Sequence, residues 1–173
     1  MAKKKPLTAL NVLTCMDAIQ RRIDSPSIPV NYIVGTKYTE KNANDIEKAI
    51  ERFARIVGFH AERTKTQGRK MDAVWKQVDG GRVQVSKEKF VTSTARKGSS
   101  DMKLVIPDIG FVACEIKFGR DTQKADQKKY QYDIEKNGGI YLIVKSFEEF
   151  LIWYVKKKGR PDIMQQAIVS LKH

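Results

Sequence analysis

Three charged residues in an apolar part of the chain have the types needed for phosphodiester chemistry. Asp101 precedes the apolar segment 102–106, and Glu115 and Lys117 close the apolar segment 111–117. Alternate residues of a β-strand share a face, so Glu115 and Lys117 are expected to point the same way. Two carboxylates can hold a hard divalent cation through oxygen, and a lysine beside them can offset negative charge that develops on a phosphate.

A surface salt bridge on an edge strand would explain the same residues without any chemistry. Glu-x-Lys is a frequent tripeptide by chance, so its spacing alone carries little weight. Here Glu115-Ile116-Lys117 is the only Glu-x-Lys in the chain, and it lies where the strand is most apolar. The sequence therefore leaves two interpretations open, a surface ion pair and a phosphodiester-cutting centre.

The charge balance indicates a polyanionic partner. The 173 residues include 33 Lys and Arg against 20 Asp and Glu, a formal net charge of +13, and residues 60–100 carry ten basic and four acidic side chains. Nucleic acid is the polyanion that a positive field of this size most commonly attracts. Solubility, or proximity to the ribosome, is the alternative explanation of the charge.

The length predicts one domain whose core needs no disulfide. Two cysteines make no disulfide framework, and Cys114, which lies in an apolar run, is expected to be a small buried hydrophobe. The basic start of the chain is not followed by an apolar stretch of signal-peptide length, and no run approaches a membrane span. We therefore expect an intracellular, cytoplasmic protein with no membrane partner.

The elements that must position the charged residues follow from periodicity and turn residues. Apolar residues spaced by three predict a helix within residues 7–24, in an N-terminal arm. A second helix, capped by Asn44, has apolar residues at 3.6-residue spacing and stops at Gly58. A strand over residues 59–66 is expected to follow.

The middle of the chain has the pattern of two hairpins. Residues 67–100 are polar and basic, and alternating valines beside Gly80-Gly81 predict a hairpin around the double glycine. Residues 102–106 and 111–117 are predicted strands, and residues 107–110 are a tight turn between them.

The C-terminal part alternates helix, strand and helix. A helix over residues 123–136 ends at Asn137-Gly138-Gly139, and the β-branched and aromatic run at 140–144 predicts a buried central strand. Ser146-Phe147-Glu148-Glu149 is a capping box that opens the next helix, and Pro161 can start a last one.

The order helix, strand, hairpin, helix, strand over residues 44–145 predicts an α/β fold in which a mixed central sheet is flanked by helices. We expect residues 1–39 to form an N-terminal arm or accessory helix. Residues 40–173 are expected to form the domain, with a basic insert at 67–100 and further helices at the C-terminal end.

The segments Gly98-Ser99-Ser100-Asp101 and Glu115-Ile116-Lys117, followed by Gln127, form a pattern that resembles the PD-(D/E)XK nuclease superfamily. Within it, the chain is most similar to the VRR-NUC group of phage, bacterial and repair-associated nucleases. The likeness covers about residues 44–152, and its spacing of helix, strand, Asp, hairpin, Glu-x-Lys, helix and Gln is more specific than any single motif. Ser100 stands where the family name has proline.

This resemblance implies a restriction-endonuclease-like core in the order αβββαβ and metal-dependent hydrolysis of phosphodiester bonds. It implies that Asp101, Glu115 and the carbonyl of Ile116 bind Mg²⁺, for which Mn²⁺ can substitute. Lys117 becomes the catalytic lysine.

Two further site residues are implied by the resemblance, and each has a simpler alternative. Gln127 would support the site, and it shares a helix face with Tyr130 and Ile134; the alternative is ordinary solvent exposure. Glu47 would be the acid of the first helix of the core, or else an exposed residue that completes a cap with Asn44.

Two basic clusters are candidates for contact with a phosphate backbone, since one precedes the site in sequence and the other adjoins it. They are Arg63, Lys65, Arg69 and Lys70, and then Arg96 and Lys97. The basic cluster at 156–160 lies at a helix C-terminus, where cations are favoured without any ligand.

These observations leave three functions open. The first is a DNA endonuclease specific for structures such as junctions or flaps, acting as a homodimer in phage or bacterial DNA replication, repair or recombination. The second is a restriction or defence nuclease of the same fold. The third is a basic DNA-binding protein without catalysis, although such a protein would gain nothing from acidic groups that face phosphates.

Overall fold

The computed structural model describes residues 8–64, 69–91 and 96–159. The elements, in chain order, are α1 (Ala9–Asp24), a 3₁₀ helix (Val30–Tyr32), α2 (Ala43–Val57), β1 (His60–Arg63), β2 (Arg69–Met71), β3 (Val74–Val78), β4 (Gly81–Ser86), β5 (Lys89–Val91), β6 (Met102–Ile106), β7 (Gly110–Ile116), α3 (Ala125–Lys136), β8 (Ile140–Val144) and α4 (Phe147–Lys157).

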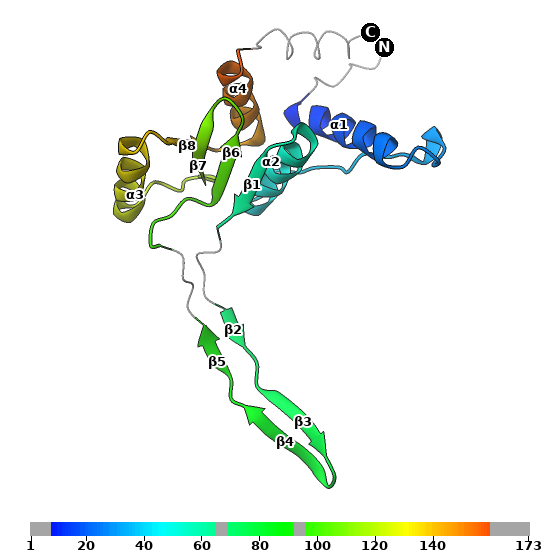
Figure 1. Ribbon diagram of the computed structural model, residues 1–173, viewed down its shortest axis with the longest axis vertical. Coiled ribbons are helices and arrows are strands. Elements are labelled where there is room, and N and C mark those ends of the chain that lie inside the picture. The colour runs from blue at the N-terminus through cyan, green and yellow to red at the C-terminus, as the bar shows by residue number, and fades with distance from the viewer. Residues whose placement is uncertain (1–7, 65–68, 92–95, 160–173) are drawn as a thin grey trace.

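A mixed sheet of four strands, in the order β1-β6-β7-β8, lies at the centre of the fold. β1 pairs antiparallel with β6, and β6 pairs antiparallel with β7. The chain then crosses over through α3 to β8, which pairs parallel with β7. Helices lie on both faces of the sheet (Figure 1). The predicted α/β class, a mixed sheet flanked by helices, is confirmed.

The prediction that residues 140–144 form a central strand is wrong, because β8 lies at the edge of this sheet. The central place beside it belongs to β7, in which residues 112–116 are all buried, whereas Ile143 of β8 is 40% exposed. The apolar sequence of β8 is explained by packing on both of its faces, not by a central place in the sheet. Val144 packs into the main core on one face, and Tyr141 packs under α3 on the other.

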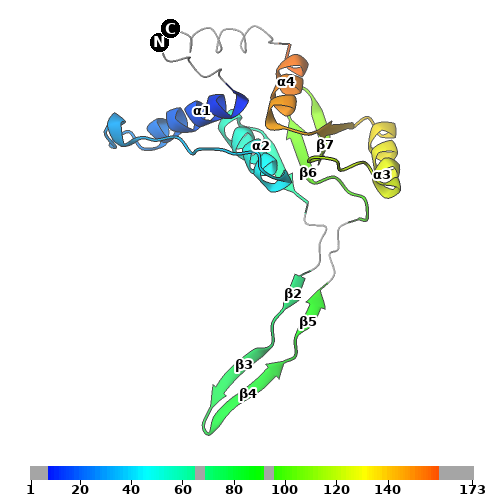
Figure 2. The same ribbon diagram turned by 180° about the vertical axis from the view of Figure 1, so that it is seen from behind.

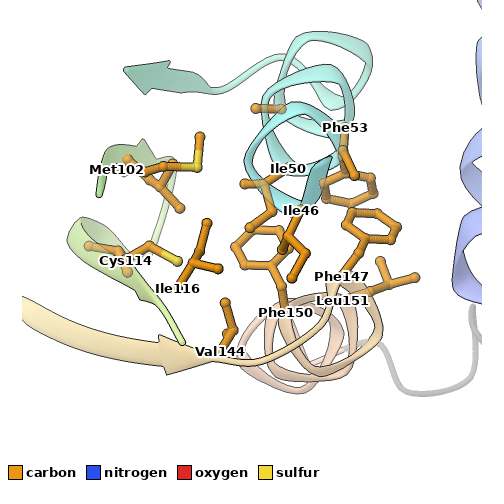
Figure 3. Packing of buried hydrophobic residues seen from close by; sticks show 14 of the residues in the cluster. Ile46, Ile50, Phe53, Met102, Cys114, Ile116, Val144, Phe147, Phe150 and Leu151 are labelled. Atoms are coloured by element: carbon orange, nitrogen blue, oxygen red, sulfur yellow. The ribbon is translucent and has the colours of Figure 1, made fainter. Parts of the chain in front are cut away.

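The main core lies between the sheet and the helices α2 and α4 (Figure 3). Alternate strand residues, among them Cys114 and Ile116, face this core. The helices contribute Ile46, Ile50, Phe53, Phe147, Phe150 and Leu151. Because successive strand residues point to opposite faces, burying Cys114 and Ile116 here directs Glu115 and Lys117 to the other face.

α3 covers that other face through a smaller apolar cluster. Ala113 of β7, Tyr141 of β8 and Tyr130 of α3 are buried in it. The two tyrosine rings meet edge to face, with centroids 6.3 Å apart. This contact packs α3 against β7 and β8.

α1 packs against α2 and α4, and its Leu13 belongs to the main core. A buried carboxylate fastens this helix to its neighbours. Asp17 accepts hydrogen bonds from Arg52 Nε of α2 at 2.6 Å and from the backbone N–H of Thr36 at 2.7 Å. The helix predicted in the N-terminal arm is confirmed, and it is packed on the core.

The cap of α2 differs from the prediction. Asn42, not Asn44, is the N-cap, and its side chain accepts a hydrogen bond from the N–H of Asp45 at 3.0 Å. Asn44 lies inside the first turn, where its side chain accepts a hydrogen bond from Arg63. The predicted stop at Gly58 is confirmed, and its φ of +89° is the left-handed conformation common at helix ends.

The starts of α4 and α3 agree with the predictions only in part. Ser146 caps α4 as predicted, accepting from the N–H of Glu149 at 3.1 Å. The carboxylate of Glu149 accepts from the N–H of Lys145 instead of closing the capping box. α3 begins at Ala125, two residues later than expected.

The basic insert contains a two-stranded ribbon that projects from the sheet (Figure 1), as the view from behind also shows (Figure 2). β2 pairs with β5 and β3 pairs with β4, both antiparallel. β3 ends and β4 begins at a turn that contains Gly80, with φ +98°. The predicted hairpin around the double glycine is confirmed.

Some predictions fall on parts of the chain that the structure leaves out. The helix expected from Pro161 and the last residues of the strand expected at 59–66 lie outside the described residues. Within the described ranges, no helix is long and apolar enough to cross a membrane.

Candidate active site

The register of β6 and β7 brings Asp101 and Glu115 together. Met102 pairs with Cys114, so the preceding residue, Asp101, lies opposite Glu115 at the end of the hairpin. Asp101 Oδ2 accepts a hydrogen bond from the backbone N–H of Ile116 at 2.8 Å, which holds this carboxylate against β7. The hairpin therefore places the two acids as the strand pattern predicts.

Lys117 follows the last residue of β7 and points to the same face as Glu115. The two side chains form an ion pair, with Lys117 Nζ 2.9 Å from Glu115 Oε1, and the two residues are only 4% and 1% exposed. β7 is flanked by β6 and β8. The alternative of a surface salt bridge on an edge strand is therefore wrong, since the pair is buried on a central strand.

Gln127, in the first turn of α3, joins the ion pair to the start of the helix. Its Nε2 donates to Glu115 Oε1 at 2.5 Å, and its Oε1 accepts from Lys117 Nζ at 3.0 Å. The same Oε1 accepts from the backbone N–H of Lys124 at 2.9 Å, which caps α3. Gln127 is half-buried and fully engaged, so the alternative of ordinary solvent exposure is wrong.

Two residues that no sequence pattern singled out complete the group. Tyr141 of β8 is buried and donates from Oη to Glu115 Oε2 at 3.4 Å. Asp121, in the turn after β7, accepts from Lys117 Nζ at 3.2 Å. Finding Tyr141 requires the parallel register of β7 and β8. Asp121 lies four residues beyond Lys117, a spacing that predicts contact in a helix, but this segment is not helical.

Burial changes the titration of all three charged groups. It raises the pKa of the Asp101 carboxyl, although a backbone hydrogen bond and the charge of Lys117 act the other way. It also raises the pKa of the Glu115 carboxyl, to which the negative charge of Asp101 adds. Burial alone would lower the pKa of Lys117, but hydrogen bonds to Glu115 and Asp121 raise it. Desolvated groups with specific charged partners are typical of functional sites.

The donors present here fit a hard divalent cation. Asp101 and Glu115 are two partly desolvated carboxylates, and a cation would offset both charges. Thr64 lies beside Asp101, because its N–H donates to the carbonyl of Asp101 at 2.7 Å, and its buried Oγ1 has no hydrogen-bond partner in the part of the chain described.

Few carboxylates are available for such a cation. In the described ranges, no three His, Cys, Asp or Glu side chains form a potential metal cluster. Mg²⁺ is usually held by one or two carboxylates and keeps several waters, so backbone, water or phosphate oxygens would complete its shell. The carbonyl of Ile116 stays a predicted ligand.

Glu47 is engaged with Arg63 rather than with Asp101 or Glu115. Arg63 Nε of β1 donates to Glu47 Oε2 at 2.5 Å. α2, which carries Glu47, covers the face of the sheet opposite to α3, and this separates it from the ion pair under α3. The alternative cap with Asn44 is wrong, because another residue caps the helix. A catalytic part for Glu47 stays a prediction.

The basic loop before Asp101 is docked on α3. Arg96 pairs with Asp133 and lies over the ring of Tyr130, 5.6 Å from its centroid. Lys97 pairs with Asp126 at 3.0 Å. All of these partners belong to α3, so the loop that leads into the site is tied to the helix that supplies Gln127.

The other basic residues that were predicted to contact a phosphate backbone are also paired with acidic side chains, or their side chains are not described. Arg63 is held by Glu47, and Lys70 pairs with Glu88 of the ribbon at 2.7 Å. Lys65 lies outside the described residues, and Arg69 is described only as backbone in β2. Exposed ion pairs contribute little and exchange readily for another anion. Nucleic-acid contact by the two clusters stays a prediction.

The candidate site is thus defined by its geometry, a buried group of acid, lysine and amide side chains at the C-terminal end of β7. No family model and no curated protein matches this chain.

Proposed function

We propose that the protein is a metal-dependent nuclease that hydrolyses phosphodiester bonds of DNA and has a restriction-endonuclease-like core. The hydrogen-bonded group of the buried Glu115 and Lys117 with the half-buried Asp101 and Gln127 is the observation that carries this proposal. Burying ionisable groups costs folding free energy that apolar residues would not cost. Apart from the strands β2–β5 of the basic insert, the elements follow the order α2-β1-β6-β7-α3-β8, and this αβββαβ order supports the proposal.

The side chains have distinct roles in this proposal. Asp101 and Glu115 would hold the cation, which when bound lowers the pKa of a water and offsets charge on the phosphate. Lys117 places a positive charge beside the phosphate and orients the attacking water. Three acceptors, from Glu115, Asp121 and Gln127, surround its ammonium, so its position is set before substrate binds.

The proposed substrate is DNA, because the net charge of +13 attracts a polyanion. Mg²⁺ is the proposed cation, with Mn²⁺ as a substitute. A single site cuts one strand, so resolving a junction by cutting two strands would take a homodimer. Branched DNA of this kind arises in phage and bacterial replication, repair and recombination.

Cleavage of linear, nicked, flapped and four-way DNA tests the proposed function. We expect cuts with Mg²⁺ or Mn²⁺ and none with EDTA. Asp101→Asn and Glu115→Gln should each abolish cleavage but keep DNA binding, because each removes a cation ligand and lessens repulsion of the phosphate. Calorimetry should show weaker Mn²⁺ binding by both variants.

Asp108→Asn is the matched control. Asp108 is an exposed acid at the opposite end of the same hairpin, and its φ of +66° suits asparagine. It should cut as the wild type does. Full activity of Asp101→Asn or Glu115→Gln would overturn the site assignment. A wild-type protein that cuts none of these DNAs with either cation would overturn the proposed function.

A further inference from the structure

The ribbon formed by β3 and β4 is solvated on both faces. Every residue of the two strands is exposed. An isolated two-stranded hairpin is marginally stable in water. A long ribbon whose side chains all lie in solvent is therefore suited to contact with a partner. Its two faces suit partners of different chemistry.

One face of the ribbon carries hydrogen-bonding side chains. Trp75 pairs with Gln84 and Gln77 pairs with Arg82 across the two strands, so the four side chains share a face. Arg82 Nε donates to Gln77 Oε1 at 3.4 Å, which agrees with this placement. Trp75 is 55% exposed and adds a large flat surface to the same face.

The other face is mainly aliphatic. Lys76 pairs with Val83 there, and Val78, two residues beyond Lys76, lies on this face as well. The valines of this face are about half exposed, at 45% for Val78 and 53% for Val83. This face has few groups that could form hydrogen bonds with a polar partner.

In the sequence, the ribbon is inserted next to the candidate site. Before it, Thr64 donates its N–H to the carbonyl of Asp101, and after it, the loop at 96–100 leads to Asp101 itself. Residues 69–91 carry six basic and three acidic side chains, a net charge of +3. A nucleic acid bound at the site would thus meet a positively charged ribbon.

We propose that this ribbon enters the major groove of duplex DNA with Gln77, Arg82 and Gln84 facing the base edges. The inference rests on the proposed function and adds the substrate class, a double strand next to the cut. The major groove of B-DNA admits a two-stranded ribbon. Arginine pairs with the acceptor edge of guanine, and glutamine pairs with the donor and acceptor edge of adenine.

Charge favours duplex DNA over a second copy of the chain as the occupant. Residues 69–91 of two copies, each with a net charge of +3, repel each other, whereas the phosphates that line the groove attract them. A second copy would cover the valine face and would leave the amide and guanidinium groups without a role.

Duplex binding by the full-length protein in EDTA tests the inference, because no cleavage can occur there. Gln77→Ala/Gln84→Ala should weaken duplex binding at least about tenfold, the loss expected for base contacts. The salt dependence of binding should keep its slope, because neither substitution removes a charge. Adding Arg82→Ala should weaken binding further. A single strand of the same sequence should be bound about equally by the wild type and the glutamine variant.

Val83→Thr/Val85→Thr is the control, since it alters the opposite face of β4 with side chains of similar shape. It should bind duplex as the wild type does and keep the same molar mass in solution. The inference is overturned if the glutamine variant binds duplex like the wild type, or loses single-strand binding equally. It is also overturned if the valine variant loses duplex binding or dissociates to a smaller species, since the ribbon would then be an interface between copies. If the wild type does not cut DNA, the proposed function is wrong, whereas the result on duplex binding by the ribbon is unaffected.

Discussion

At the scale of single residues, Lys117 is a charged side chain held by several partners. Its ammonium is buried and has acceptors on Glu115, Asp121 and Gln127. A lysine held in this way can be a structural partner of Glu115 or a catalytic group, and both depend on the same contacts. Stability and rate must therefore be measured separately.

We expect Lys117→Ala to lose both stability and rate. Leaving Glu115 buried without its partner should cost about 3 kcal/mol of unfolding free energy. Loss of charge beside the phosphate should lower the cleavage rate by a factor of order 10². Urea unfolding gives the first value, and single-turnover cleavage, at a temperature where the variant is folded, gives the second.

Two further variants separate the roles of Lys117. Lys117→Met together with Glu115→Gln removes both charges and should regain most of the lost stability while staying inactive. Lys117→Arg keeps a charge but should not restore the rate, because a planar guanidinium does not replace a compact ammonium. Near wild-type cleavage by folded Lys117→Ala would show that the lysine is only a structural partner.

At the scale of elements, the site depends on how the loop at 96–100 sits against α3. Gly98 has φ +79°, and a Cβ at this position would lie 2.5 Å from the backbone carbonyl of Asp126. Only glycine allows so close an approach. The loop and the helix that supply Asp101 and Gln127 are thereby held together.

Gly98→Ala should lower both stability and cleavage more than Gly138→Ala does. Gly138 has nearly the same φ, +78°, but nothing lies within 4 Å of its added Cβ. Gly138→Ala should therefore show only the cost of the left-handed backbone, about 1–2 kcal/mol. Gly98→Ala should show that cost plus displacement of the loop from α3. Equal losses in urea unfolding, with equal cleavage rates, would mean that the close approach does not matter.

At the scale of the whole molecule, Asp17 links α1, α2 and the segment that contains Thr36. The residue is fully buried. Burial alone would raise the pKa of Asp17, but hydrogen bonds from Thr36 and Arg52 lower it from its usual 3.8 to about 2. The folded state therefore holds this proton less tightly than the unfolded chain does.

The stability of the molecule should fall in acid partly through Asp17. Because the folded pKa is the lower one, its contribution of about 2 kcal/mol is complete above the unfolded value and is lost as pH falls toward 2. Asp17→Asn should lose this amount at neutral pH, and its stability should change less between pH 4 and pH 2. Urea unfolding across that range measures the effect.

The control for this prediction is Asp24→Asn, which neutralises an exposed acid of the same helix. Its stability should follow the wild-type curve. A curve for Asp17→Asn that runs parallel to the wild-type curve throughout the acid range would contradict the role of Asp17.

Local patterns were enough to predict most elements and one pair of site residues. Alternation in residues 111–117 places Glu115 and Lys117 on one face, because successive strand residues point to opposite sides. The turn at 107–110 closes a short hairpin, so Asp101 is near them in any fold that keeps it. The double glycine predicts the ribbon turn, since φ above zero suits glycine. These features depend on residues close in sequence.

Only the tertiary structure decided the features that join distant segments. The place of β8 at the sheet edge and the contact of Tyr141 with Glu115 depend on the register set by the α3 crossover. Glu47 pairs with Arg63 because α2 packs on the face opposite to α3. The burial of Lys117 likewise follows from the helix above it. Pairing and packing between remote segments set these contacts, and short-range periodicity carries no information about them.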